Sequence, residues 1–238
     1  MANLTLGIDT SGAVSVAVAD ACQVLSRRMD ERARHHDEVL LEMIDAALVE
    51  AGASRADISC VVAGRGPGPF TGLRVGLVTA RSIATILGAR LIGLPSLDAI
   101  ALEAAKESPD AKTIAVALDA RRREVYWALY EVSGDVSDVS SREIVRTFEP
   151  GVAAPADVAS SLAAADVLVG SGAHLYPEIL PPTGELRHAD AGFLIEAALS
   201  AEARGEDLSS TEPLYLREAD AAKPKRRKSA LGLGDRPA

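Results

Sequence analysis

Hydrophobic and polar positions in the first part of the chain follow the pattern of a β-meander that leads into alternating helices and strands. Short apolar runs bounded by turn residues predict strands at residues 4–8, 13–19, 24–28, 58–63 and 91–93. Apolar residues recur at helical spacing in three longer segments, which predict helices at residues 32–51, 73–87 and 96–107. Ser96 is the expected N-cap of the third helix.

The second part of the chain repeats this order after a break at residues 108–110. The pattern predicts strands at residues 113–118, 124–132, 143–148 and 167–169, a helix at 155–165, a closing helix at 193–204 and an irregular segment at 208–217. Asp9 and Asp119 each end the first strand of a repeat. Duplication predicts an α/β protein of two ribonuclease-H-like lobes, residues 1–108 and 109–220, arranged as in actin-like ATPases, followed by a basic, disordered tail at 221–238.

The ends of the two first strands are the candidate nucleotide positions of such a fold. An acidic residue and a glycine turn hold phosphates and metal there in nucleotide-binding members. The first turn fits this pattern, whereas Asp119 is followed by Ala120 and three arginines without a glycine. The phosphate site is therefore half-built, and the possible nucleotide or anion contacts are Asp9, Thr10, Ser11, Gly12 and Asp119.

A glycine-rich turn joins the strand at residues 58–63 to the next helix. Its motif positions are Gly66, Gly68, Thr71 and Gly72. No Gly-Lys-Ser/Thr follows, the glycines fit no G-x-G-x-x-G register, and Pro67 and Pro69 remove two N–H donors. Two interpretations stay open: a tight strand-to-helix connection with Thr71 as N-cap, or an anion site at the helix N-terminus.

Charge and composition argue against direct nucleic-acid binding by the body of the chain. The 238 residues carry a formal net charge of −9, but residues 223–238 hold six basic side chains and one acidic one, which leaves −14 on residues 1–222. An acidic body repels phosphate backbones, and 3% aromatic residues make a base-stacking platform improbable. No apolar run has the length of a membrane span and no leader pattern is present, so we expect a cytoplasmic protein without a membrane partner.

Several motifs together resemble the TsaB (YeaZ) family, the bacterial subunit of the tRNA threonylcarbamoyladenosine synthase complex. They are the segments at residues 6–11, 66–76, 93–97, 119–122 and 215–217. The resemblance implies a paralogue of the catalytic subunit TsaD, whose metal-binding histidines align with Ser96 and Ile100. Neither side chain binds metal as imidazole does. His35, His36, His174 and His188 form no i, i+4 pair, so we expect no metal site and no catalytic residue.

The helices at residues 32–51 and 72–87 carry the candidate partner interface. The resemblance implies that they form a helical bundle used for self-pairing and for pairing with TsaD. The candidate residues are Val39, Leu40, Leu41, Ile44, Leu48, Arg74, Leu77 and Arg81. An ordinary core is the alternative for most of the apolar stripe, although its breadth favours a second buried face.

The expected function is that of a non-catalytic dimerisation or scaffold subunit. The resemblance implies that it acts with a TsaD-like catalytic paralogue and a TsaE-like ATPase in threonylcarbamoyl transfer to the adenosine beside the anticodon of ANN-decoding tRNAs. ATP and a divalent metal would then sit on the partner subunits, none would be bound by the isolated chain, and tRNA would be contacted only indirectly. The alternatives are an independent ATP-dependent phosphotransferase that depends on Asp9, and a self-associating, protease-like chaperone of bacterial growth.

Overall fold

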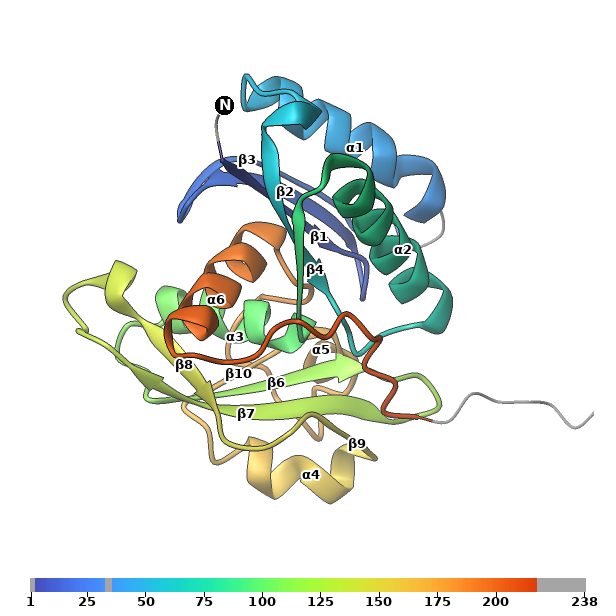
Figure 1. Cartoon of the computed structure of the whole chain (residues 1–238). Helices are drawn as coiled ribbons and strands as arrows, with labels where there is room; N and C mark the ends of the chain where they lie inside the picture. Colours follow the sequence, from blue (N-terminus) through green and yellow to red (C-terminus); the bar gives the residue numbers. More distant parts are fainter. Residues whose placement is uncertain (1–2, 33–35, 218–238) are drawn as a thin grey trace, which may run out of the picture.

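The first sheet of the protein confirms the predicted meander. The computed structural model describes residues 3–32 and 36–217. Five strands lie in the order β3-β2-β1-β4-β5, with β1 antiparallel to β2 and parallel to β4. Their bounds are β1 Leu4–Asp9, β2 Val14–Asp20, β3 Gln23–Asp30, β4 Ile58–Gly64 and β5 Arg90–Leu94. Nearly every residue of β1 and β2 is buried, since helices cover both faces of the sheet (Figure 1).

Two helices cover the outer face of this sheet. They are α1 (His36–Glu50) and α2 (Phe70–Leu87), and a short 3₁₀ turn, η1 (Arg55–Asp57), precedes β4. α2 is the one helix in the described part of the chain with the length and hydropathy of a membrane span. Its buried residues, which include Leu73, Leu77 and Ala80, pack toward the sheet. Figure 1 shows the two helices side by side; α1 packs on β2 and β3, and α2 packs mainly on β4.

The second sheet repeats the connectivity of the first. Its main path runs β10-β6-β7-β8, with β9 paired to β7, so β6, β7, β8 and β10 correspond to β1, β2, β3 and β4. Their bounds are β6 Thr113–Asp119, β7 Val125–Ser133, β8 Glu143–Arg146, β9 Gly151–Ala153 and β10 Val167–Val169. The turn η2 (Val139–Ser141) and the helices α4 (Pro155–Leu162) and α5 (Ser171–Leu175) complete this half. The predicted duplication of ribonuclease-H-like lobes is confirmed.

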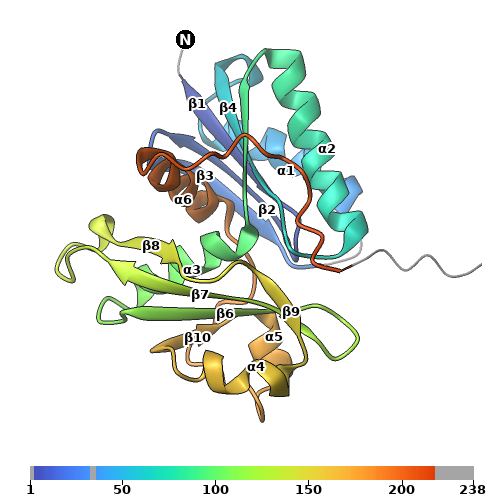
Figure 2. The same cartoon turned by 60° about the horizontal axis from the view of Figure 1, so that its bottom comes forward.

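Two helices lie between the sheets and join the lobes. α3 (Ser96–Glu107) follows the first sheet in sequence but packs on β6 and β8, whereas α6 (Ala191–Ala203) returns to pack on β1 and β2. Figure 2 shows the pair between the two layers of strands. One hydrophobic core therefore runs through both halves. The chain passes from the first sheet to the second between α3 and β6, beside the predicted division at residue 108.

The structure corrects both predicted helix caps. Thr71 and Ser96 lie inside the first turns of α2 and α3, and the cap positions are held by Pro69 and Pro95. Each proline has the extended backbone of a cap residue but makes no side-chain cap hydrogen bond. The pattern also did not predict β9 and α5, which have only three and five residues. Elements this short leave little periodicity to recognise.

The irregular segment at residues 208–217, here named the C-terminal strap, ties the two lobes together. Gly93 donates its N–H to the carbonyl of Leu208 at 2.9 Å, and Leu214 donates to the carbonyl of Arg65 at 2.8 Å. At its far end Arg217 donates to the carbonyl of Ala120, on the second lobe, at 3.1 Å. The strap is therefore hydrogen-bonded to both lobes. The predicted basic tail at residues 221–238 lies outside the described residues.

A half-buried carboxyl on α3, that of Glu103, makes stability depend on pH. Burial, and then the neighbouring carboxylates of Asp190 and Glu107, raise the pKa of Glu103 from 4.5 to about 7. The folded state thus keeps a proton that the unfolded state releases, so the free energy of unfolding should fall as the pH rises from about 4.5 to about 7. We expect Glu103→Gln to reduce this pH-dependent fall in stability by about 1–2 kcal/mol, which is less than the full pKa shift would give because the side chain is partly exposed to solvent. Urea unfolding at pH 5 and pH 8 measures it, with the exposed Glu178→Gln as control; equal pH dependence in the two variants contradicts the assignment.

Candidate functional site

The first turn of the predicted nucleotide site is closed around Asp9. This residue is 1% exposed, and its Oδ1 accepts hydrogen bonds from the N–H and Oγ of Ser11 at 2.8 and 2.6 Å. Its Oδ2 accepts a hydrogen bond from Ser96 Oγ. Burial raises the pKa of Asp9, and the bonds from Ser11 and Ser96 oppose that rise. Both carboxylate oxygens are therefore engaged inside the protein rather than directed at a ligand.

The glycine-rich turn packs directly on this first turn. A Cβ on Gly68 would lie 2.3 Å from the carbonyl oxygen of Ser11, and one on Gly64 would lie 1.8 Å from Asp9 Oδ2. Thr10 Oγ1 donates to the carbonyl of Gly72 at 2.8 Å, while Gly66 has a φ of +89°. These contacts leave no room for a side chain. Of the two interpretations open from the sequence, the geometry favours the tight strand-to-helix connection, without Thr71 as its cap.

The turn after β6 has the same local hydrogen bond as the turn after β1, but arginines follow its aspartate where the first turn has a glycine. The N–H of Arg121 donates to Asp119 Oδ1 at 2.7 Å, as Ser11 does to Asp9, so the two aspartates are structurally equivalent. Arg121 Nη1 also pairs with Asp119 Oδ2 at 2.9 Å. Three consecutive arginines, Arg121, Arg122 and Arg123, have left-handed φ values of 60°, 53° and 63°. Such values are costly for residues with a Cβ.

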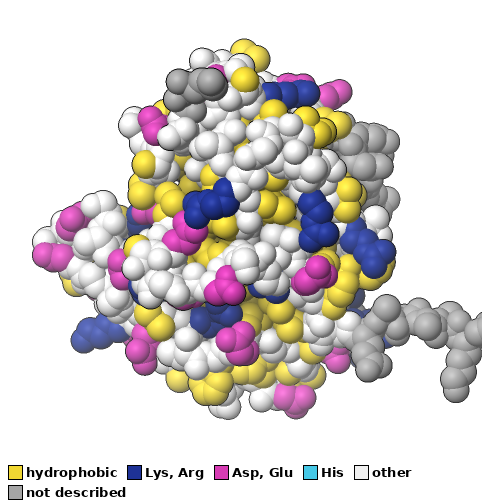
Figure 3. Space-filling view, in the orientation of Figure 1, with side chains coloured by type: hydrophobic (Ala, Val, Ile, Leu, Met, Phe, Trp, Pro, Cys, Tyr) yellow, Lys and Arg dark blue, Asp and Glu magenta, His cyan; other side chains and the backbone are white. Residues whose placement is uncertain are grey.

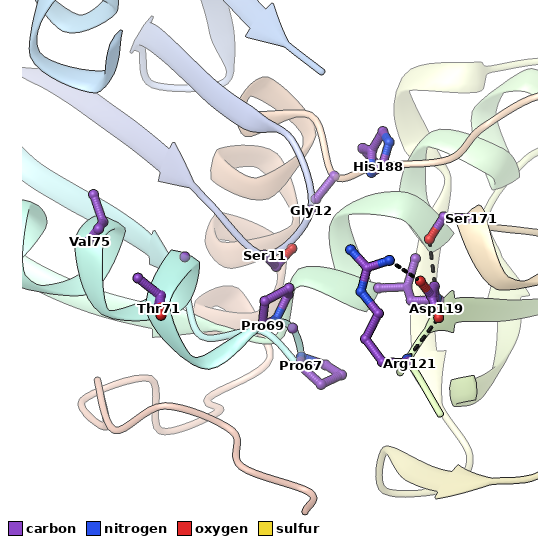
Figure 4. A pocket seen from close by; sticks show the side chains of 14 residues that line it. Ser11, Gly12, Pro67, Pro69, Thr71, Val75, Asp119, Arg121, Ser171 and His188 are labelled. Atoms are coloured by element: carbon purple, nitrogen blue, oxygen red, sulfur yellow. Dashed lines mark hydrogen bonds and ion pairs between the residues drawn. The ribbon is translucent and has the colours of Figure 1, made fainter. Parts of the chain in front are cut away.

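A cavity of about 470 Å³ lies between the two turns, in the cleft between the lobes (Figure 4). Ser11, Gly12 and Thr71 line it from the first lobe, and Asp119, Arg121 and Ser171 from the second. Of the predicted nucleotide contacts, Ser11, Gly12 and Asp119 therefore reach the cavity, whereas Asp9 and Thr10 are buried behind it. The independent phosphotransferase that depends on Asp9 gains no support from this arrangement.

His188 and Ser171 also line this cleft, although no sequence motif predicted either of them there. The His188 ring lies next to Gly12, so that a Cβ added to Gly12 would be 2.6 Å from His188 Nδ1. Burial lowers the pKa of His188. Ser171 Oγ accepts the N–H of Asp119 at 3.2 Å. The folding of the second lobe brings both residues to the cleft, and neither belongs to a short sequence motif. The only sequence signal was that Ser171 lies two residues after the last strand of the repeat, where functional loops of α/β folds lie.

The positions aligned with the TsaD histidines hold no metal ligands. Ser96 Oγ accepts the N–H of Gly66 at 3.1 Å and donates to Asp9, while Ile100 is fully buried. In the described ranges, no three His, Cys, Asp or Glu side chains gather in a way that could hold a metal ion. His35 lies outside those ranges.

The structure corrects half of the predicted partner interface. Leu40, Ile44, Leu48 and Leu77 are 1–8% exposed and pack in the core under α1 and α2. They cannot contact a partner while the fold is intact, because the first sheet covers them. Val39 is half-buried, and Leu41, at 54% exposure, is open. The apolar stripe of α1 is as broad as predicted, but the residues at its centre face the first sheet.

The open face of α1 and α2 carries other apolar residues that the prediction left out. Val49, Val78 and Ile86 are 64–80% exposed. Val78 lies between Arg74 and Arg81, four and three residues away, and hence on one face of α2. These arginines bind the C-terminal strap: Arg74 Nε donates to the Tyr215 hydroxyl at 3.0 Å and Arg81 Nη2 to Thr211 Oγ1 at 2.8 Å. We define Leu41, Val49, Val78 and Ile86 as the outer helical face.

Comparison with known proteins gives consistent matches. The family model described as tRNA N6-adenosine threonylcarbamoyltransferase, TsaD, matches residues 24–175. The tRNA threonylcarbamoyladenosine biosynthesis protein TsaB of Escherichia coli is 32% identical over 196 residues, covering 77% of this chain and 81% of its own. An uncharacterised protein of Mycobacterium tuberculosis is 38% identical over 198 residues, 83% of this chain and 82% of its own.

A solved structure has the same fold. YeaZ from Pseudomonas aeruginosa superposes with a TM-score of 0.74 and 31% identity, covering 90% of this chain and all of that one. This chain is thus similar to YeaZ along most of its sequence as well as in its fold. This chain belongs to the TsaB (YeaZ) family and has the two-lobed actin-like ATPase architecture.

Proposed function

We propose that this chain is a non-catalytic subunit of a tRNA threonylcarbamoyladenosine synthase. It holds a TsaD-like paralogue in a form competent to transfer the threonylcarbamoyl group to the adenosine beside the anticodon of ANN-decoding tRNAs. A TsaE-like ATPase completes the assembly, and ATP and the divalent metal belong to these partners. Relatives named for this pathway support the proposal. The assembly works in the cytoplasm.

The single observation that carries the non-catalytic role is the closed first turn. Both carboxylate oxygens of Asp9 accept hydrogen bonds from Ser11 and Ser96, and Gly68 of the glycine-rich turn packs against the backbone of Ser11. Ser96 and Ile100 replace the metal ligands that the resemblance places in TsaD. The chain thus retains the fold of a transferase paralogue without the groups needed for its chemistry.

The outer helical face supports the scaffold role. Four exposed apolar side chains on two adjacent helices are the type of surface that pairs with another subunit. We propose that a TsaD-like partner covers this face in the complex, and that a second copy of this chain covers it in isolation. Because the body carries −14, the partner supplies most of the affinity for tRNA.

Reconstitution with and without this chain tests the proposal. The full-length chain is co-expressed with the TsaD-like and TsaE-like proteins of the same organism, and unmodified tRNA, ATP and the threonylcarbamoyl-adenylate donor are supplied. Nucleoside analysis of digested tRNA should show the modified adenosine only when all three proteins are present. Equal modification without this chain would refute the scaffold role, and ATP hydrolysis by this chain alone would favour an independent enzyme.

A further inference from the structure

The two ends of the second sheet differ in whether a further segment covers them. At the β10 end, Thr183 donates its N–H to the carbonyl of Leu168 at 2.9 Å, so a later loop covers that side. The first sheet is covered in the same way at β5, where Gly93 bonds to the C-terminal strap. β8 lies at the other end of the second sheet and pairs with no further segment in the ranges that the structure describes (Figure 2). Its outer edge is therefore open to backbone hydrogen bonds from another strand.

The register of β7 and β8 identifies the backbone groups that face this open edge. Tyr130 lies opposite Arg146, and Thr147 donates its N–H to the carbonyl of Leu129 at 2.9 Å. Because backbone groups alternate in direction along an antiparallel strand, those of Ile144 and Arg146 point away from β7. Each of these two residues offers one N–H donor and one C=O acceptor to an added strand.

The exposed charge around this edge is acidic. Residues 131–149 contain five acidic side chains, all of them exposed: Glu131, Asp135, Asp138, Glu143 and Glu149. The two arginines of this stretch are directed inward, since Arg142 is buried and donates to the carbonyl of Ala111, and Arg146 pairs with Asp98 on α3. Figure 3 shows acidic side chains on the part of the molecule that projects at the left, where Figure 1 shows the loop between β7 and β8. A partner that docks here must therefore bring positive charge.

A cavity of about 270 Å³ lies along the inner side of β8, between that strand, α3 and the end of α6. It shares no residue with the cleft between the lobes. The carboxylates of Asp98, Glu149 and Glu206 line it together with the guanidinium groups of Arg146 and Arg204. Arg146 pairs with Asp98 at 3.2 Å and Arg204 with Glu206 at 2.7 Å, but a carboxylate accepts more than one hydrogen bond and the lining keeps an excess of negative charge. The cavity therefore suits one basic side chain.

The outer side of β8 offers apolar contacts instead. Val145 and Phe148 are 47% and 59% exposed there, and the ring centroid of Phe148 lies 6.4 Å from that of Trp127. Side chains of a strand alternate between the two faces of a sheet, so an added strand would direct every second side chain toward the cavity and the others toward Val145. We propose that the free edge of β8 binds an extended segment of a partner protein in which basic and apolar side chains alternate. A second copy of β8 does not fit, because it would bring like charges together.

The test is a fluorescence-anisotropy titration of the full-length chain with a labelled peptide of alternating lysine and valine. This peptide should bind about tenfold more tightly than one in which the same lysines and valines form two blocks, because only alternation directs each residue type to its own side of the sheet. Amide hydrogen exchange followed by NMR locates the contact. Bound peptide should slow exchange at Ile144 and Arg146, whose N–H groups face the open edge, and leave it unchanged at Val145, whose N–H faces β7.

Charge-reversal variants test the acidic surface. Glu143→Lys combined with Glu149→Lys should weaken binding of the alternating peptide about tenfold. Glu178→Lys combined with Glu185→Lys makes the same reversals at exposed positions elsewhere on the second lobe and should leave binding unchanged. Thermal unfolding verifies that both variants are folded.

Three results would overturn the proposal. They are equal binding of the alternating and block peptides, equal losses in the two double variants, and unchanged exchange at Ile144 and Arg146 in the presence of saturating peptide. Self-association of the unchanged chain that the reversals at Glu143 and Glu149 abolish would make a second copy the occupant, and would overturn the assignment to a partner protein. β8 lies on the other lobe from the outer helical face, so each of these results leaves the proposed function standing.

Discussion

Gly64→Ala is expected to lower the free energy of unfolding by about 3 kcal/mol, one of the largest effects of adding a single carbon to this chain. Gly64 ends β4 directly over the buried carboxylate, and the new Cβ would lie 1.8 Å from Asp9 Oδ2 and 2.9 Å from Ser96 Oγ. Asp9 must then turn away and lose its bond from Ser96, which leaves a buried carboxylate poorly satisfied. Chemical unfolding followed by circular dichroism measures the change.

A double-mutant cycle separates this clash from any general cost of alanine. Asp9→Ala is itself destabilising, but in that background Gly64→Ala should cost less than about 1 kcal/mol, because the obstructing carboxylate is gone. Gly52→Ala is the matched control: no atom lies within 4 Å of its Cβ, so only its φ of +64° opposes the change. If the losses of stability from Gly64→Ala and Asp9→Ala are additive, the contact between the new Cβ and Asp9 is not what destabilises the Gly64→Ala variant.

The order of strands and helices could be predicted because each element carries its own periodicity. β1, β2 and β4 are continuous or alternating apolar runs, and Asp9 and Asp119 mark equivalent ends because both terminate a buried strand. Pro69 and Pro95 hold the cap positions, whereas Thr71, two residues after Pro69, and Ser96, directly after Pro95, look like N-caps in the sequence because of their hydroxyls but already lie inside the helices.

The candidate site was harder to predict because its members meet only in the folded chain. Arg81 binds Thr211, 130 positions away, and Arg74 binds Tyr215, 141 positions away, so neither partner could be read from spacing. The apolar stripe of α1 was ambiguous for another reason. Periodicity identifies a broad apolar face, but it does not say which edge lies against the sheet and which is left for a partner.

The adjacent leucines of α1 should respond oppositely to the same substitution. Leu40 is 1% exposed and Leu41 is 54% exposed. Leu40→Glu places a carboxylate in the core and should cost about 3–5 kcal/mol of stability, so any loss of pairing follows from unfolding. Leu41→Glu should change stability by less than about 0.5 kcal/mol but weaken pairing with the TsaD-like partner about 30-fold.

Pairing is measured by calorimetric titration of the purified TsaD-like partner, with unfolding curves of each variant recorded alongside. Val78→Glu, on α2, should reproduce the effect of Leu41→Glu, because both lie on the outer helical face and a buried interface resists an unpaired carboxylate. Val136→Glu introduces the same charge at a site that is 51% exposed on the second lobe, and it should pair normally. If Leu41→Glu and Val78→Glu both pair as Val136→Glu does, the partner binds elsewhere, since a charge in the middle of an apolar contact cannot be neutral.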